Sequence, residues 1–201
     1  MFIAYAMGAV LAWKFFGSEA GPAFFYPPAG VTVAAMMLTR RSQWPPIVAA
    51  ILLGEALVDL YFGNAPAVAA GYSLANAAEP LVGASLTMRW CRGAPDLRDR
   101  RDLAAFGAGA CLLGPGMGGL IGGSTAHLYD GSGWLTDVLN WWVGDGLGVL
   151  VVGTPILLWA RQSAIVRSRP VETAAVLGLT AAVSALAFWA NTPPSILILP
   201  L

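Results

Sequence analysis

Ten of the eleven basic residues of this chain are arginines that fall in three short stretches, and their distribution constrains the fold more than any other feature of the sequence. Lys14 is the exception. Roughly 45 to 60 residues almost free of Lys and Arg separate the stretches, enough for a helical hairpin, because one membrane span needs about 20 residues. Cytoplasmic loops of membrane proteins carry an excess of Lys and Arg, so all three stretches are predicted to lie in the cytoplasm. They consist of Arg40 and Arg41, then Arg89, Arg92, Arg98, Arg100 and Arg101, and finally Arg161, Arg167 and Arg169.

Composition supports a membrane protein and argues against other classes. Hydrophobic residues make up 57% of the chain and charged residues 11%, against about 25% charged residues in ordinary soluble domains. With a mean hydropathy of +0.68, the chain has too little charge to cover a water-facing surface. The formal net charge is zero, so no basic field attracts nucleic acid. We therefore predict an all-α fold, a polytopic transmembrane helical bundle.

Seven spans and the start of an eighth are predicted from the apolar runs and the arginine stretches. The N-terminus is placed in the cytoplasm, so that the even-numbered helices end at arginine. We expect residues 1–201 to form a single integral-membrane domain whose last helix is cut short, because an apolar run opens at Ser195 and stops at Leu201. The predicted spans cover about 1–16, 28–40, 44–62, 66–90, 102–126, 135–160 and 171–190.

A helix-breaking motif stands at the beginning of the second predicted span. Residues Pro27-Pro28-Ala29-Gly30 interrupt the apolar pattern there. Proline is tolerated in a first helical turn, because its missing N–H would have no helical partner anyway. We expect the preceding Tyr26 to lie in an extracytoplasmic turn formed by residues 17–27. The alternative is a partly re-entrant start, in which irregular backbone at membrane depth is covered by protein.

Glycines crowd the span predicted at 102–126. Small residues let membrane helices approach closely, so this span is predicted to pack tightly against its neighbours. The stretch superficially resembles a phosphate-binding loop, but it lacks the Lys-Ser/Thr ending that such loops need. The glycines are Gly114, Gly116, Gly118, Gly119, Gly122 and Gly123.

Four acidic residues fall inside predicted spans, where ionisable groups are costly and usually face the bundle interior or a wet cavity. Glu55 and Asp59 are four residues apart, so they share one helix face. Asp59 is placed near the outer end of its span, with Glu55 one turn deeper. Glu79 follows Asn76 by one turn and lies near mid-membrane, at a depth similar to that of Asp145.

These acids allow two interpretations. The functional one is a polar pocket, open to the outside, that binds a cation or a polar ligand. The structural one is a set of protonated carboxyls that hold helices together by hydrogen bonds. No Lys or Arg within the spans pairs with them, which favours the functional interpretation. The candidate ligand-binding or coupling residues are Asp145, Glu79, Asn76, Glu55, Asp59, Asn140, Trp141 and Trp142.

Two of these candidates complete the expected pocket. Asn140 is expected to form a polar ring with Asn76 toward the outer face, and the Trp141-Trp142 pair to supply an apolar wall. The helices predicted at 44–62, 66–90 and 135–160 should then be mutual neighbours. One histidine and two cysteines without metal spacing provide no multi-histidine site, so no metal and no cofactor are expected.

Several motifs, in order along the chain, resemble those of a known family. Residues 140–148, N-W-W-V-G-D-G-L-G, are similar to the signature helix of the membrane-associated sensor domain, the first-described MASE family. The stretch 26–30 resembles its W-P-P-A-G-I motif, with Tyr where Trp is more usual. Residues 76–80 resemble its N-x-x-E-P element, and 101–103 its R-D-V/L start before a Gly-rich helix.

This resemblance implies an eight-helix sensory module of the bacterial inner membrane. Such modules precede histidine kinases or diguanylate cyclases, so a cytoplasmic effector in the same or a partner chain is expected. The other implied partners are the lipid bilayer and an unknown small ligand or membrane protein. A homodimer is left open, and no nucleic acid is expected. The chain itself carries no kinase or cyclase motif.

The sequence also raises two rival functions. A small transporter or channel would use the intramembrane carboxylates as coupling sites. An intramembrane aspartyl protease is disfavoured, because Trp142 occupies the position where a G-x-G-D motif needs glycine. Asp130, which would have to face Asp145, is expected in a turn.

Overall fold

The computed structural model describes residues 1–16 and 25–160, together with Val171 and Ala175. The residues described between 1 and 160 form helices joined by short connections, as the predicted all-α fold requires. The spans predicted at 171–190 and from Ser195 lie outside the described residues. The helices are α1 (Phe2–Phe16), α2 (Pro27–Leu38), η1 (Arg41–Gln43), α3 (Trp44–Tyr61), α4 (Pro66–Trp90), α5 (Arg100–Phe106), η2 (Gly107–Leu113), α6 (Gly114–Asp130), α7 (Trp134–Gly148) and η3 (Val149–Gly153).

Three stretches within the described part of the chain are long and apolar enough to cross a membrane: Arg41–Tyr61, Arg100–Asp130 and Trp134–Ala160. Two shorter apolar helices, α1 and α2, accompany them. The 25-residue α4 is long enough to span but is less apolar. The six helices predicted between residues 1 and 160 are thus all present, while seven spans are not established.

The two longest helices each contain a π-helical segment that ends two residues before a proline. η2 ends at Leu113, before Pro115, and η3 ends at Val152-Gly153, before Pro155. Proline has no N–H to donate to the carbonyl four residues earlier, so the regular α-helical hydrogen bonding is interrupted there. A π-helical turn is one way for a helix to continue through such an interruption.

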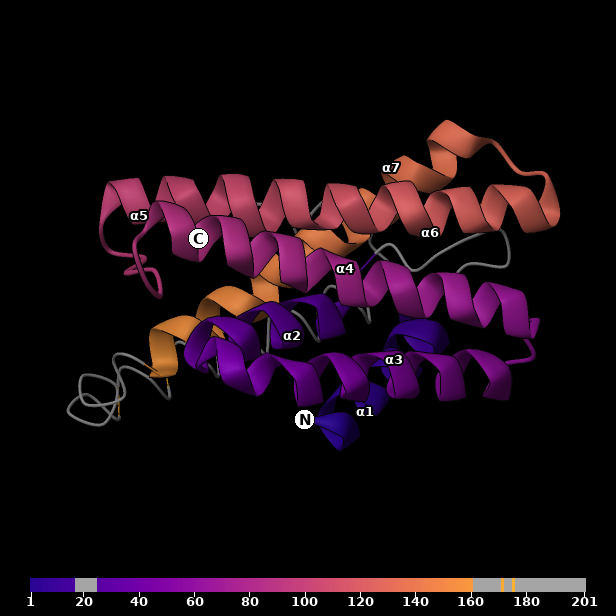
Figure 1. The fold of residues 1–201 in the computed structure, drawn as a ribbon, viewed down its shortest axis with the longest axis horizontal. Coiled ribbons are helices and arrows are strands. Elements are labelled where there is room, and N and C mark those ends of the chain that lie inside the picture. Colours follow the sequence, from indigo (N-terminus) through magenta and orange to yellow (C-terminus); the bar gives the residue numbers. More distant parts are fainter. Residues whose placement is uncertain (17–24, 161–170, 172–174, 176–201) are drawn as a thin grey trace. The chain divides into compact units, whose positions relative to one another are not determined.

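The connections between helices alternate between two ends of the bundle. In Figure 1, residues 39–43 and 91–99, which carry arginines, lie at one end. Residues 62–65 and 131–133 lie at the opposite end. This alternation is the one predicted from the charge pattern. Which end faces the cytoplasm stays a prediction.

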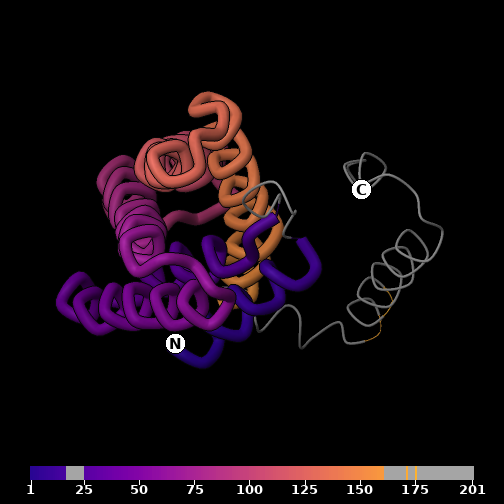
Figure 2. Tube along the Cα trace, turned by 90° about the vertical axis from the view of Figure 1, so that its right-hand side faces the viewer, coloured from indigo at the N-terminus to yellow at the C-terminus, as the bar shows by residue number. Residues whose placement is uncertain are grey.

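The bundle is organised around the glycine-rich helix. α6 packs against both α4 and α7, and α3 packs against α4, as the view along the helices in Figure 2 shows. A Cβ added to Gly123 would lie 2.5 Å from the backbone nitrogen of Val138 on α7. Only glycine allows the two backbones to come so close. The tight packing predicted for this span is therefore confirmed.

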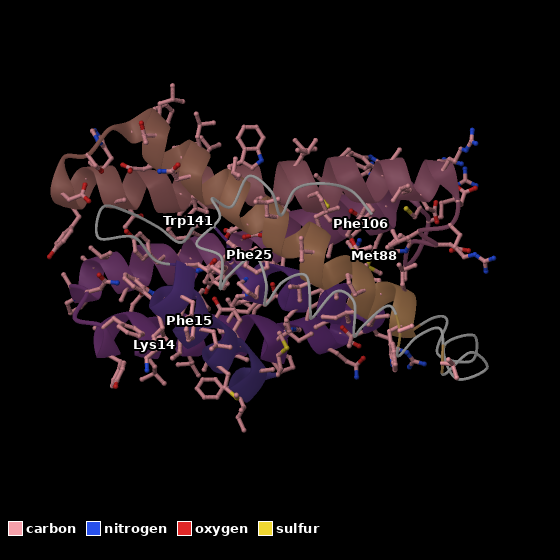
Figure 3. The ribbon with its side chains drawn as sticks, turned by 180° about the vertical axis from the view of Figure 1, so that it is seen from behind. Lys14, Phe15, Phe25, Met88, Phe106 and Trp141 are labelled. Carbon is pink, nitrogen blue, oxygen red and sulfur yellow. The ribbon has the colours of Figure 1, made fainter. Side chains whose placement is uncertain are left out.

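The prediction that three acid-bearing helices would be mutual neighbours is only partly right. α3 and α4 pack together, but α7 and its continuation lie mainly against α6 and α2. The helix from Trp134 runs obliquely across the others (Figures 1 and 3). The glycines of α6 and α7 make these close crossings possible, and sequence spacing alone does not reveal which helices they join.

α2 begins inside the bundle. Its N-cap residue Tyr26 is 8% exposed, and its backbone N–H donates to the Gly144 carbonyl of α7 at 3.1 Å. Pro27 and Pro28 have no N–H groups, so the start of this helix leaves few donors to satisfy. Tyr26 is therefore buried in the bundle and not in an exposed turn, and the start of α2 is covered by protein, as the alternative requires; its place relative to the membrane stays a prediction. At 12 residues, α2 is about 18 Å long, too short to cross a hydrocarbon core of about 30 Å alone.

The glycine-rich helix extends farther than predicted. It was expected to end near residue 126, but α6 continues to Asp130. Gly131 then adopts a left-handed conformation with φ 73°, and its N–H bonds the carbonyl of His127. Glycine takes this conformation without steric cost, so it is a strong helix terminator. Asp130, expected in a turn, is consequently the last helical residue.

Candidate functional site

A buried cluster of polar side chains lies where α1, α2 and α3 meet. Its centre is the Glu55 carboxyl, which is 3% exposed. The Tyr5 hydroxyl donates to Glu55 Oε2 at 2.8 Å and the Tyr26 hydroxyl donates to the same oxygen at 2.6 Å. The two hydroxyl oxygens are 3.0 Å apart. Three segments far apart in sequence are thus joined by one carboxyl oxygen.

α4 brings the polar side chain of Asn76 to this cluster. Asn76, 4% exposed, faces the Glu55 carboxyl, but its side-chain nitrogen has no hydrogen-bond partner within the described residues. Pro80, four residues later, has no N–H to donate to the backbone carbonyl of Asn76. The middle of α4 therefore presents polar groups that helical hydrogen bonding does not satisfy.

Glu79 and Asp145 form a pair of buried carboxyls between α4 and α7. They are 1% and 4% exposed, and they are electrostatic neighbours. Neither oxygen of Glu79, nor Oδ2 of Asp145, has a hydrogen-bond partner in the parts of the chain described. Two ionised carboxylates are acceptors only, so a hydrogen bond between them requires a proton on one of the two.

Glycines of α6 make room for this pair. A Cβ at Gly118 would lie 3.3 Å from Glu79 Oε2 and 3.5 Å from Trp141 Nε1. The Trp141 ring, 6% exposed, packs over Gly122 and against Tyr72, whose ring centroid is 4.8 Å away. Figure 3 labels Trp141 on the helix that crosses the bundle. Trp141 thus lies beside the Glu79–Asp145 pair as a buried aromatic side chain; the pocket wall expected from the Trp141-Trp142 pair stays a prediction.

The cluster carries no compensating positive charge in the described part of the chain. None of the described Lys and Arg side chains forms an ion pair with Glu55, Glu79 or Asp145. Insertion scales assign about 2.5–3.5 kcal/mol to an ionised acid at the middle of a membrane helix. These carboxyls therefore favour binding a proton, a cation or a polar ligand.

Of the remaining predicted site residues, Asp59 is an electrostatic neighbour of Glu55 one turn farther along α3, whereas Asn140 and Trp142 are not brought to the cluster. Asp59 is fully buried near the end of α3, where its Oδ1 accepts from Asn64 Nδ2 at 2.9 Å. Asn140 lies on an exposed part of α7, and so is not brought to Asn76. Trp142 is half-buried and its Nε1 donates to the Leu112 carbonyl of η2 at 2.8 Å. The expected pocket opening to the outside stays a prediction.

Sequence reasoning missed two members of the cluster. Tyr5 was read as part of an apolar span, and Tyr26 was assigned to an outer turn. The available signal was a phenolic hydroxyl in an otherwise apolar stretch, because a buried Tyr O–H usually needs a hydrogen-bond partner. The acids of the other spans were the obvious acceptors.

The side chains present limit the chemistry of the cluster. It offers carboxyl, phenol and amide groups, which exchange protons and bind hard cations or polar ligands. No group of three or more His, Cys, Asp or Glu residues suited to a metal ion occurs among the described residues 1–16, 25–160, 171 and 175.

Comparison with known proteins gives one match. The family model MASE1 matches residues 1–201 of the chain. No curated protein and no solved structure matches.

Proposed function

Because this chain belongs to the MASE1 family, whose members are non-catalytic sensory domains of membranes, we propose that it is the input domain of a bacterial signalling protein. Its stimulus changes the occupancy of the Glu79–Asp145 pair by a proton, a cation or a polar ligand. The resulting helix rearrangement passes to a cytoplasmic effector in the same or a partner chain, as is typical of MASE1 domains.

The carrying observation is a pair of buried carboxyls in which three oxygens, both of Glu79 and Oδ2 of Asp145, have no hydrogen-bond partner within the described residues. A carboxyl that serves only to hold helices together should have its oxygens matched by donors, because an unmatched buried polar group is costly. The oxygens of Glu79 are unmatched. The pair also joins α4 to α7, and the neighbouring Glu55 joins α1, α2 and α3. A change in the state of the Glu79–Asp145 pair therefore affects the packing of most helices of the bundle.

The mechanism follows from differential binding. A ligand shifts a conformational equilibrium only when it binds one conformation more tightly than the other. Removing the bound species leaves two like charges facing each other in a medium of low dielectric constant, which drives Glu79 and Asp145 apart. Since α4 and α7 both pack on α6, their separation repacks that helix.

The test is the signalling output of the full-length protein carrying Asp145→Asn. This substitution keeps the shape of the side chain and removes its charge and its proton exchange. We expect normal insertion and folding with loss of the response to the stimulus. Asp137→Asn is the matched control, because Asp137 is a buried acid of the same helix that accepts from Ser132. A fully responsive and equally stable Asp145→Asn protein overturns the proposal.

Orientation is part of the proposal. We place the connection at residues 91–99 in the cytoplasm and the N-terminus on the same side, on the positive-inside rule. The test is labelling of a cysteine at Asp96 in a background without Cys91 and Cys111. An impermeant reagent should reach it only in inverted vesicles. Labelling of this cysteine from the outside of intact cells would show that residues 91–99 face the outside, and the proposed orientation would be wrong.

One observation favours a small transporter or channel as a second candidate. Pro80 interrupts the hydrogen bonding of α4 directly beside the Glu79 carboxyl, and interrupted helices line the substrate sites of many transporters. Flux of protons or cations through proteoliposomes, lost on Glu79→Gln, would support this function. Binding without flux supports the sensor.

A further inference from the structure

A pocket lies at the end of the bundle where α4 finishes and α5 begins. Its volume is about 620 Å³, and it is lined by Arg89, Trp90, Arg92, Arg101, Ala104 and Ala105. Half of the lining residues are arginines, contributed by both helices and the connection between them. The pocket is separate from the Glu79–Asp145 pair.

The aspartates around this pocket are engaged by backbone groups. Asp99 accepts from the backbone N–H groups of Arg101 at 2.9 Å and Asp102 at 3.1 Å. Asp102 accepts from Asp96 N at 2.9 Å, and Asp96 accepts from Arg98 N at 3.1 Å. These hydrogen bonds stabilise the conformation of the connection between α4 and α5. In the described ranges, none of the three lining arginines forms an ion pair with them.

Arg92 occupies a backbone position that normally favours glycine. Its φ is 58°, in the left-handed region, and the next residue, Gly93, donates its N–H to the Met88 carbonyl at 2.9 Å. This is the helix-ending arrangement in which glycine is the usual residue at the position of Arg92. Arginine is less stable than glycine in that conformation, so the backbone geometry does not account for an arginine at this position.

The pocket also lies where the apolar helices end. Trp90 is 38% exposed, and tryptophan is enriched at the level of lipid headgroups. The exposed Leu103 of α5, one turn into the next helix, is 48% exposed and apolar. A phosphate at this level would therefore have arginines on one side and an apolar surface for acyl chains next to them.

We propose that this pocket binds a phosphate group, and that an anionic phospholipid of the surrounding leaflet supplies it. The planar guanidinium groups of Arg89, Arg92 and Arg101 match phosphate oxygens, each with two parallel N–H donors. Basic pockets at the ends of membrane helices bind headgroups of this chemistry. A lipid bound there clamps the end of α4 to the start of α5, the helix that leads through η2 to the glycines beside Glu79.

The test measures binding of short-chain phosphatidylglycerol to the full chain purified in neutral detergent. Phosphatidylcholine, which carries the same phosphate with a compensating cation, and inorganic phosphate are the comparison ligands. We expect phosphatidylglycerol to bind more tightly than either. Arg101→Ala should weaken its binding about fivefold, on the roughly 1 kcal/mol that each basic residue contributes at a lipid surface. Arg100→Ala, with the same charge loss at a residue outside the pocket lining, should weaken it less than twofold.

Arg92→Gly separates binding from folding. This variant should lose affinity about fivefold while its thermal midpoint stays the same or rises, because glycine suits the backbone at that position. Equal losses from Arg100→Ala and Arg101→Ala indicate diffuse attraction and overturn the pocket. If inorganic phosphate competes at the same concentration as phosphatidylglycerol, the proposal that a lipid supplies the bound phosphate is wrong. Unchanged lipid binding by both Arg92→Gly and Arg101→Ala overturns the proposal altogether.

Discussion

Glu55 and Asp145 lie in the same buried cluster, but they differ in the hydrogen bonds that their carboxyl oxygens accept from the protein. Glu55 Oε2 accepts two tyrosine hydroxyls, at 2.8 and 2.6 Å. Asp145 Oδ2 and both oxygens of its neighbour Glu79 accept no hydrogen bond within the described residues. Both carboxyls are almost fully buried, so exposure does not account for the difference.

This difference separates a structural half of the cluster from an exchangeable half. A carboxyl that accepts several hydrogen bonds is held in one state and one position by them. A pair of carboxyls with unmatched oxygens needs a proton or a bound species, so its state depends on what the surroundings supply. We therefore expect substitutions at Glu55 to act on stability, and substitutions at Glu79 and Asp145 to act on response.

The largest effect on stability is expected from Glu55→Met. This change removes the shared acceptor and leaves two buried phenols facing an apolar side chain. The cost is about 1–3 kcal/mol for each hydroxyl that loses its partner, measured as the free energy of unfolding by SDS titration in mixed micelles. Glu55→Gln is the control, because its amide oxygen still accepts. Equal stability of the two variants would place Glu55 in the exchangeable half.

A smaller loss is expected from Gly122→Ala on α6. The added Cβ would lie 2.6 Å from the Trp141 ring, and overpacking of this kind costs about 1–3 kcal/mol. Gly107→Ala is the matched control on the same continuous helix, because no atom beyond its own stretch of helix backbone lies within 4 Å of the added Cβ. The comparison uses the same unfolding assay. If both variants unfold alike, Trp141 is not held against α6 as the structure places it.

The sequence could predict that Glu79 and Asp145 lie at a similar level of the bundle, but it could not predict the partners of the acids. Spacing from the arginine stretches placed Glu79 and Asp145 near one another in depth, and the cost of exposing acids to lipid pointed them inward. The contacts of Tyr5 and Tyr26 with Glu55 join residues 50 and 29 positions apart. Helical periodicity assigns a residue to a face, and does not say which helix that face meets.

The helix positions were predictable to a similar extent. Apolar runs and arginines gave the six helices between residues 1 and 160 within a few residues. The start of α2 inside the bundle was not decided, because Pro27-Pro28 is compatible with either an outer turn or a covered entry. The bond from Tyr26 N to the Gly144 carbonyl decides it, and that bond depends on how closely the α7 glycines let α2 approach.

Removing one tyrosine hydroxyl is expected to cost less than removing the acceptor. Tyr5→Phe and Tyr26→Phe each delete one donor to Glu55 and leave the other in place. Each should lower the free energy of unfolding by about 0.5–1.5 kcal/mol, the net value of one hydrogen bond. Tyr61→Phe on α3 is the control, since that side chain is 78% exposed. A loss in Tyr61→Phe as large as in Tyr26→Phe would contradict the assignment of both hydroxyls to Glu55.

The smallest change in stability is expected from Glu79→Gln and Asp145→Asn, the two substitutions expected to change the signalling response most. Glu79→Gln and Asp145→Asn disturb few matched hydrogen bonds, because the oxygens of Glu79 and Asp145 Oδ2 have no donors. Each new amide can donate to the opposing carboxyl, so the free energy of unfolding should change by less than about 1 kcal/mol. The double variant should show a coupling energy of about 0.5–3 kcal/mol, as expected for residues in contact. An Asp145→Asn variant that loses as much stability as Glu55→Met would show that Asp145 is held by protein donors as Glu55 is, and the division of the cluster into two halves would be wrong.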